Sequence, residues 1–240
     1  MAKKQQNLER KAIADAIRRD QARKERIRSL SILVACGLVV AILIGLALTK
    51  YVMNRHAGER VAGTPFAEIG VSRAAAACTP IHKVTYVVPA TNHVPNGTPL
   101  TYPNSPPAFG KHWRNPMSPT EYRTFYTTTD RPAKELLVHS LEHGYTVIWY
   151  DETLAANGAA VADLKGIAAK YPLGDHVVIA PWTSKDGGPF PAGSHLALTH
   201  WTGPSKQQGV WEYCGKVSGA VAHEFVSSYP KTNSPEPAVG

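Results

Sequence analysis

The feature that most constrains how this chain can fold is a long run without charge. The 20 residues Leu30–Thr49 contain no Asp, Glu, Lys or Arg. As an α-helix rising about 1.5 Å per residue, such a run spans the hydrocarbon core of a bilayer, which is about 30 Å thick. A cleaved signal peptide has a shorter apolar region of about 7–15 residues, and it lacks a preceding segment as long as residues 1–28. The sequence therefore predicts one retained transmembrane helix over residues 29–52.

Basic residues gather ahead of this run and indicate its orientation. Residues 1–28 hold ten Lys or Arg against four Asp or Glu, and they contain no Pro or Gly, so we expect a helical tail. Cytoplasmic flanks of membrane helices are enriched in Lys and Arg. We therefore expect a cell-membrane protein with a cytoplasmic N-terminus and an extracytoplasmic C-terminal domain.

The same tail accounts for most of the net charge of +8. The basic character of the chain is thus a local property, and it does not indicate a nucleic-acid-binding surface. Lys and Arg close to a bilayer attract anionic lipid headgroups, so membrane lipids are the partner that we expect for residues 1–28. A solvated tail that only sets the orientation explains the charge equally well.

Cysteine usage fits the expected topology. Cys36 lies inside the apolar run, while Cys78 and Cys214 lie beyond it. Extracytoplasmic compartments are oxidising, and an even pair of cysteines there indicates a disulfide. We expect a Cys78–Cys214 bond, with two unpaired buried thiols as the alternative.

Composition divides the remaining chain into three parts. Residues 53–77, rich in Gly, Pro and Ala, are typical of a linker, and the Pro-containing residues 231–240 are expected to be disordered. Residues 78–230 carry the periodic patterns of a folded domain. The expected elements are strands over 82–88, 145–150, 176–181 and 195–201 and helices over 133–143, 159–170 and 218–229. This order predicts an α+β (or α/β) domain with a small mixed sheet.

The segment His139–His143 carries the most specific chemical signal. On a helix, His139 and His143 are four residues apart, so both imidazoles share one face and can bind one metal ion. Glu142 lies near the same side as a ligand, an orienting partner or a proton acceptor. The string also matches H-x-x-E-H, a signature of zinc hydrolases that need a third ligand and a bound water.

Two further histidines lie in residues 89–119, a stretch with eight prolines in which regular structure is not expected. His93 and His112 come from this stretch, and the stretch could fold over the helix to complete a site of three or four ligands. Long irregular segments inside compact domains are often functional.

Three motifs in these segments resemble one known family. They are H-V-x-x-G-T from His93, P-P-x-x-G-x-H ending at His112, and L-V-H-x-L-E-H-G around His139. Together they resemble an uncharacterised family common in actinobacteria, the domain of unknown function numbered 3105. The resemblance covers about residues 78–229 and implies a basic tail, one transmembrane helix and an outer domain. It also implies a shared cluster, which consists of His93, His112, His139, Glu142 and His143.

Three functions are compatible with these residues. The first is a metal-binding domain for copper or zinc, since imidazole suits both ions, with the cluster as ligands. The second is a metal-dependent envelope hydrolase with Glu142 as general base. The third is an accessory or structural subunit of a membrane complex without catalytic activity, in which the cluster holds the Pro-rich stretch on the helix.

Overall fold

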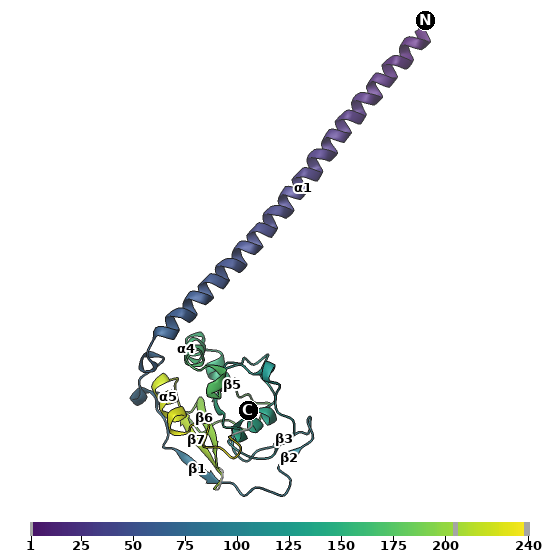
Figure 1. Cartoon of the computed structure of the whole chain (residues 1–240). Coiled ribbons are helices and arrows are strands. Elements are labelled where there is room, and N and C mark those ends of the chain that lie inside the picture. The colour runs from purple at the N-terminus through teal and green to yellow at the C-terminus, as the bar shows by residue number, and fades with distance from the viewer. Residues whose placement is uncertain (1, 204–205, 238–240) are drawn as a thin grey trace. The chain divides into compact units, whose positions relative to one another are not determined.

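The computed structural model describes residues 2–203 and 206–237, and the chain divides into two compact units, Met1–Ala57 and Gly58–Gly240. Helix α1, Ala2–Gly63, is a single uninterrupted helix (Figure 1). Among the described residues, its segment Arg18–Thr49 is the one helix long and apolar enough to cross a membrane by length and composition. The predicted apolar helix is therefore present.

The second unit combines short helices with a five-stranded mixed sheet, as the α+β prediction requires. Its 3₁₀ helices are η1 (Phe66–Glu68), η2 (Arg73–Ala76), η3 (Pro119–Glu121) and η4 (Leu173–Asp175). Its α-helices are α2 (Lys134–Glu142), α3 (Glu152–Ala155), α4 (Gly158–Ala168) and α5 (Gly219–Ser228). Its strands are β1 (His82–Thr85), β2 (His93–Val94), β3 (His112–Trp113), β4 (Thr146–Tyr150), β5 (Val177–Pro181), β6 (Leu196–Thr202) and β7 (Gln208–Cys214).

The main sheet has the strand order β1-β7-β6-β4-β5. Strands β4 and β5 run parallel, and the other neighbours are antiparallel. Strand β7 was not predicted from the sequence, although it pairs with two strands. Its alternation is interrupted by Gly209, where a side chain would overlap the ring of Phe109, and by Glu212, which is buried and paired with Arg73.

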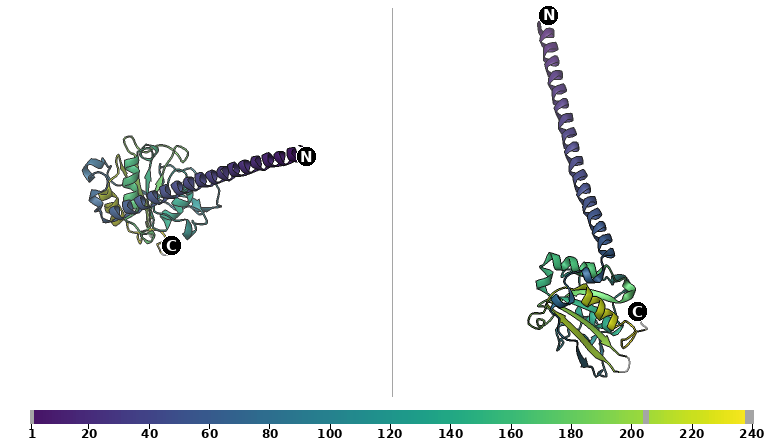
Figure 2. Two further views of the ribbon diagram at one scale, coloured as in Figure 1. Left: turned by 90° about the horizontal axis from the view of Figure 1, so that it is seen from above. Right: turned by 90° about the vertical axis from the view of Figure 1, so that its left-hand side faces the viewer.

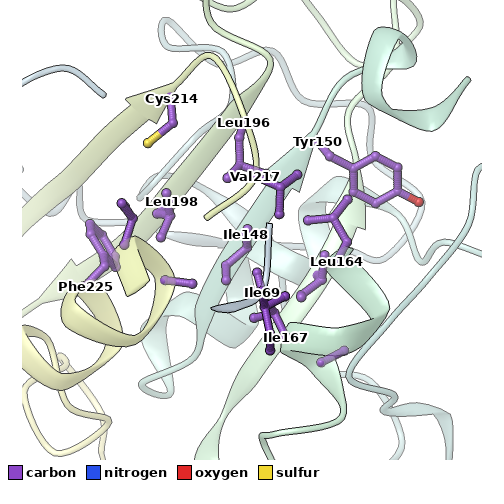
Figure 3. Close-up of a cluster of buried hydrophobic side chains, with 14 of the residues drawn as sticks. Ile69, Ile148, Tyr150, Leu164, Ile167, Leu196, Leu198, Cys214, Val217 and Phe225 are labelled. Atoms are coloured by element: carbon purple, nitrogen blue, oxygen red, sulfur yellow. The ribbon is translucent and has the colours of Figure 1, made fainter. Parts of the chain in front are cut away.

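Both faces of this sheet are covered, because successive side chains of a strand point to opposite faces. From β4, Ile148 and Tyr150 face one core with residues of α4 and α5, whereas Val147 and Trp149 face a second core with residues of α2. Figure 3 shows the first core, and the right-hand view of Figure 2 shows α5, in yellow, lying against the strands. The second core is the one that supports the histidine cluster.

Residues 53–77, expected to be a linker, contain the end of α1 and both η1 and η2. Ile69 and Ala76 are buried in the first core, because these apolar side chains find space beside α5. Gly70 has φ +71°, and a side chain there would overlap the carbonyl of Val217. The folded part of the second unit therefore starts before Cys78.

A disulfide joins Cys78 to Cys214 at the end of β7, as expected from the sequence. It ties the segment before β1 to the last third of the chain, 136 residues away. The pair lies beside the first core, with Cys214 fully buried.

Residues 231–237 are packed, in contrast to the disorder expected over 231–240, and residues 238–240 lie outside the described residues. Ser234 is fully buried, and the backbone carbonyl of Asn233 lies 2.9 Å from Nε2 of His200. Gly144 has φ +86°, and a side chain there would overlap the carbonyl of Lys231. Backbone groups and the small residue Gly144 thus anchor residues 231–237 against the end of α2. Proline content alone could not predict this packing.

Candidate metal centre

Helix α2 positions three of the five residues singled out from the sequence. It spans Lys134–Glu142, close to the predicted 133–143, and it ends before Gly144, whose positive φ suits a helix C-terminus. Leu137, Val138 and Leu141 are fully buried in the second core and fix the helix against the sheet. His139 and Glu142 are therefore held in place by a packed helix.

The Pro-rich stretch supplies the other two histidines from a short parallel ladder. In β2 and β3, His93 is directly opposite His112, and their ring centroids are 4.5 Å apart. Backbone bonds from His112 to Asn92 and from Arg114 to Val94 hold the ladder together. Strands of two residues are too short to show a periodic pattern. The sequence could therefore identify His93 and His112 as candidate ligands, but not their pairing in a ladder.

His93, His112, His139 and Glu142 converge. Each offers one ligand atom, and the four atoms all lie within 4.8 Å of one another. Oε2 of Glu142 is 2.9 Å from Nε2 of His112 and 3.3 Å from Nε2 of His93. Only His93 is partly open to solvent, with 38% of its side chain exposed. An ion could therefore reach the cluster from the His93 side.

Hydrogen bonds orient the rings of His112 and His139. Nδ1 of His112 lies 2.8 Å from the carbonyl of Gly110, and Nδ1 of His139 lies 2.6 Å from the carbonyl of Trp113. A carbonyl only accepts, so each Nδ1 carries a proton, and in the neutral form of either ring Nε2 keeps the lone pair that a metal needs. Metal-binding histidines are commonly oriented in this way.

Two buried atoms of the cluster lack hydrogen bonds. Among the residues that the structure describes, neither Nε2 of His112 nor Oε2 of Glu142 has a hydrogen-bond partner, although the two atoms are only 2.9 Å apart. Buried polar atoms without partners are rare and destabilising. Two ligand atoms that each bind the same metal ion at about 2.0–2.1 Å lie roughly 3 Å from each other. The spacing fits two ligands that share an ion.

The charge states also suit a cation. Burial, with a contribution from the neighbouring His112 and His143, lowers the pKa of His139 to about 4, so this ring is neutral at neutral pH. Burial opposes ionisation of Glu142, but His112, His93 and His139 outweigh it and hold the pKa of the carboxyl below its usual value. The cluster thus offers a neutral, correctly oriented imidazole and a carboxylate.

Two residues behind the cluster were missed by sequence reasoning. The amide Nδ2 of Asn92 donates to Oε1 of Glu142 at 3.1 Å, and the hydroxyl of Tyr86 donates to Oδ1 of Asn92 at 2.7 Å. This chain of bonds fixes the orientation of the Glu142 carboxylate. The only signal in the sequence was the position of Asn92 directly before His93.

His143 lies beside the four convergent residues and not among them. Its Nε2 is 2.8 Å from Nε2 of His139, and its Nδ1 is 3.3 Å from the carbonyl of Glu236. His143, Glu142 and Glu236 form a second group with ligand atoms within 4.8 Å of one another. The shared helix face was predicted correctly, but Glu236, which is 93 residues further along the chain, could not be associated with it from the sequence.

One family model matches this chain. It is described as "Protein of unknown function (DUF3105)", and it matches residues 93–239. Comparisons with curated proteins and with solved structures found no match. The matched segment begins at His93 and contains all five residues of the predicted cluster, so the resemblance seen in the motifs is confirmed. Because the match covers more than half of its length, the chain belongs to the DUF3105 family of proteins of unknown function.

Proposed function

We propose that this protein is a membrane-anchored, extracytoplasmic metal-binding protein. Its cluster of His93, His112, His139 and Glu142 binds one transition-metal ion. The observation that carries the proposal is the pair of buried atoms, Nε2 of His112 and Oε2 of Glu142, which lie close together without a hydrogen bond. A cation between them would satisfy both.

The ligand types favour copper or zinc. Neutral imidazole binds both ions well, and a single carboxylate is compatible with either. Four protein ligands suit tetrahedral zinc, while a site rich in imidazole also suits Cu(II). The partial exposure of His93 leaves one side of the cluster accessible to an exchanging ion.

The extracytoplasmic location rests on the N-terminal segment and on the cysteines. The apolar helix and its basic tail support a cytoplasmic N-terminus by the positive-inside tendency. The Cys78–Cys214 disulfide supports an oxidising compartment for the second unit. In this arrangement the tail lies at the anionic inner surface of the membrane, and the cluster takes its metal from the cell envelope.

A ligand role for Glu142 is better supported than a general-base role. One carboxylate oxygen accepts from Asn92, and the other lies against His93 and His112. A general base would need a free carboxylate oxygen next to a water bound to a metal with three other protein ligands, and neither oxygen of Glu142 is free in this way. Hydrolysis therefore stays outside this proposal.

Metal titration of the full chain in detergent tests the proposal. The protein is stripped with a chelator and titrated with Zn²⁺ or Cu²⁺, and bound metal and melting temperature are measured. We expect about one tightly bound ion at the cluster, a raised melting temperature and at least tenfold weaker binding in His93→Gln. His82→Gln, which changes an exposed histidine on β1, is the matched control and should bind as the wild type does. If the wild-type chain binds neither ion, the cluster is a structural network and the proposal fails.

A further inference from the structure

A cavity lies at the carboxyl ends of the two parallel strands of the sheet, away from the histidine cluster. Asp151 directly follows β4 and Trp182 directly follows β5, and both line a cavity of about 350 Å³. Ligands of α/β sheets commonly bind beyond the carboxyl ends of parallel strands. None of the five clustered residues lines this cavity, so an inference about it is independent of the metal proposal.

A histidine and a carboxylate are paired at one side of this cavity. His195 directly precedes β6, and its Nδ1 lies 2.7 Å from Oδ2 of Asp151. A carboxylate only accepts, so Nδ1 donates and the pair fixes the ring. Oδ1 of Asp151 accepts from the backbone of Leu154 and caps α3. Both oxygens of Asp151 are thus held, whereas Nε2 of His195 has no hydrogen bond to the described residues and is available to a ligand.

The apolar part of the cavity lining is preorganised. Trp182 and Phe190 are almost fully buried and line the cavity together with Pro189 and Pro191. The indole of Trp182 donates to the carbonyl of Gly188 at 2.9 Å. This hydrogen bond holds the loop between β5 and β6 in one conformation, so little conformational entropy is lost when a ligand binds.

Asp186 anchors the same loop. Its carboxylate accepts from both the backbone and the hydroxyl of Thr183, each at 2.9 Å, and it forms a partly buried ion pair with Arg131 at 2.5 Å. Asp186 is paired with the positive charge of Arg131 and does not line the cavity, so its charge does not act on a ligand there. The ligand-facing charges are those of Asp151 and Glu152.

The charge of the lining is acidic. Asp151 and Glu152 are its ionisable carboxyl groups, and no Lys or Arg is among the described residues that line the cavity. Aromatic rings attract cations through their faces, and carboxylates do so directly. A volume of about 350 Å³ is at the lower end of the range for small-molecule sites.

We propose that this cavity binds a small organic amine with an aromatic or apolar body. The ammonium group lies against the Asp151–His195 pair and Glu152, and the body packs on Trp182 and Phe190. Nε2 of His195 accepts a hydrogen bond from the ammonium group, which keeps its charge. The apolar walls give affinity, and the carboxylates select a cation over a neutral molecule of the same shape.

Calorimetry on the full chain in detergent tests this proposal with a matched pair of probes. Phenethylamine carries the charge, and phenethyl alcohol has nearly the same shape without it. We expect phenethylamine to bind at least tenfold more tightly than the alcohol. Asp151→Asn should remove most of this preference, because asparagine still caps α3 but has no charge.

A second variant and a control separate binding from folding. Phe190→Ala should weaken both probes, while Glu68→Gln, which removes an exposed carboxylate from η1, should change neither. Thermal melts show whether each variant is folded. Equal binding of the two probes, no binding of phenethylamine to the wild type, or an unchanged preference in folded Asp151→Asn would each overturn the proposal.

Discussion

Asn92 links the helix of the cluster to the Pro-rich stretch. Its amide donates to Glu142, and its carbonyl oxygen accepts from Tyr86. Groups that orient metal ligands typically contribute a factor of about 10–100 in metal affinity. In the proposed metal site, Asn92 is therefore expected to contribute to metal affinity without being a ligand.

We expect Asn92→Ala to lower the metal affinity of the full chain by about 10–100-fold, because the Glu142 carboxylate loses its fixed orientation. Competition with a chromophoric chelator measures the change. Asn115→Ala is the control, since Asn115 is exposed and its hydrogen bonds with Asn96 are made by its backbone atoms. Equal losses in the two variants would contradict an orienting role for Asn92.

His200 gives the protein a defined acid sensitivity. It is fully buried on β6, and burial lowers its pKa to about 4. An unfolded histidine titrates near pH 6.5. Between these two values the unfolded chain binds a proton that the folded chain does not, so stability falls as the pH falls through this range.

We expect His200 to contribute about 3 kcal/mol to this loss between pH 6.5 and pH 4. We expect melting curves of the full chain to show a steeper loss of stability toward acid in the wild type than in His200→Gln. The other buried histidines affect both proteins alike. Parallel pH profiles would show that His200 does not titrate in this way.

At the scale of elements, sequence patterns were sufficient where an element is long and packed. The helix around His139 and the strand that follows it were predicted within one or two residues, since their apolar side chains repeat with clear periods. Strand β7 and the β2–β3 ladder were missed. In β7, Gly209 and Glu212 interrupt the alternation of apolar and polar side chains. The β2–β3 ladder is held by backbone hydrogen bonds, which leave no pattern in the side chains.

The end of α2 depends on a glycine in a left-handed conformation. Gly144→Ala should destabilise the protein by about 1–3 kcal/mol, because alanine is strained at φ +86° and its Cβ meets the carbonyl of Lys231. Thermal denaturation of the full chain measures the loss. Gly174→Ala is a suitable control, since nothing lies within 4 Å of a side chain added there. A Gly144→Ala protein as stable as the control would contradict the packing of residues 231–237 on α2.

At the scale of the molecule, four residues far apart in the sequence form one cluster. His93 and His112 come from a ladder, and His139 and Glu142 come from a helix that packs on the sheet. The sequence indicated which residue types were involved. It could not indicate that His143 would lie beside Glu236, because the two residues are 93 positions apart in the sequence.

The disulfide gives a prediction about the whole molecule. With Cys36→Ser as background, Cys78 and Cys214 should not react with a maleimide in protein taken from cells until a reductant is added. Replacing both by serine should cost about 4–5 kcal/mol of stability, because the bond closes a loop of 136 residues. Free thiols in unreduced protein would place the second unit in a reducing compartment and contradict the proposed topology.

The packing of the C-terminal residues has a practical consequence for purification. The backbone of Glu236 donates to the carbonyl of Glu142, and its own carbonyl lies beside His143. A polyhistidine tag fused after Gly240 would begin only a few residues from these contacts and would bring six additional imidazoles to the edge of the cluster. Metal taken up by such a fusion would report on the tag as much as on the protein, so affinity tags belong at the N-terminus of the chain.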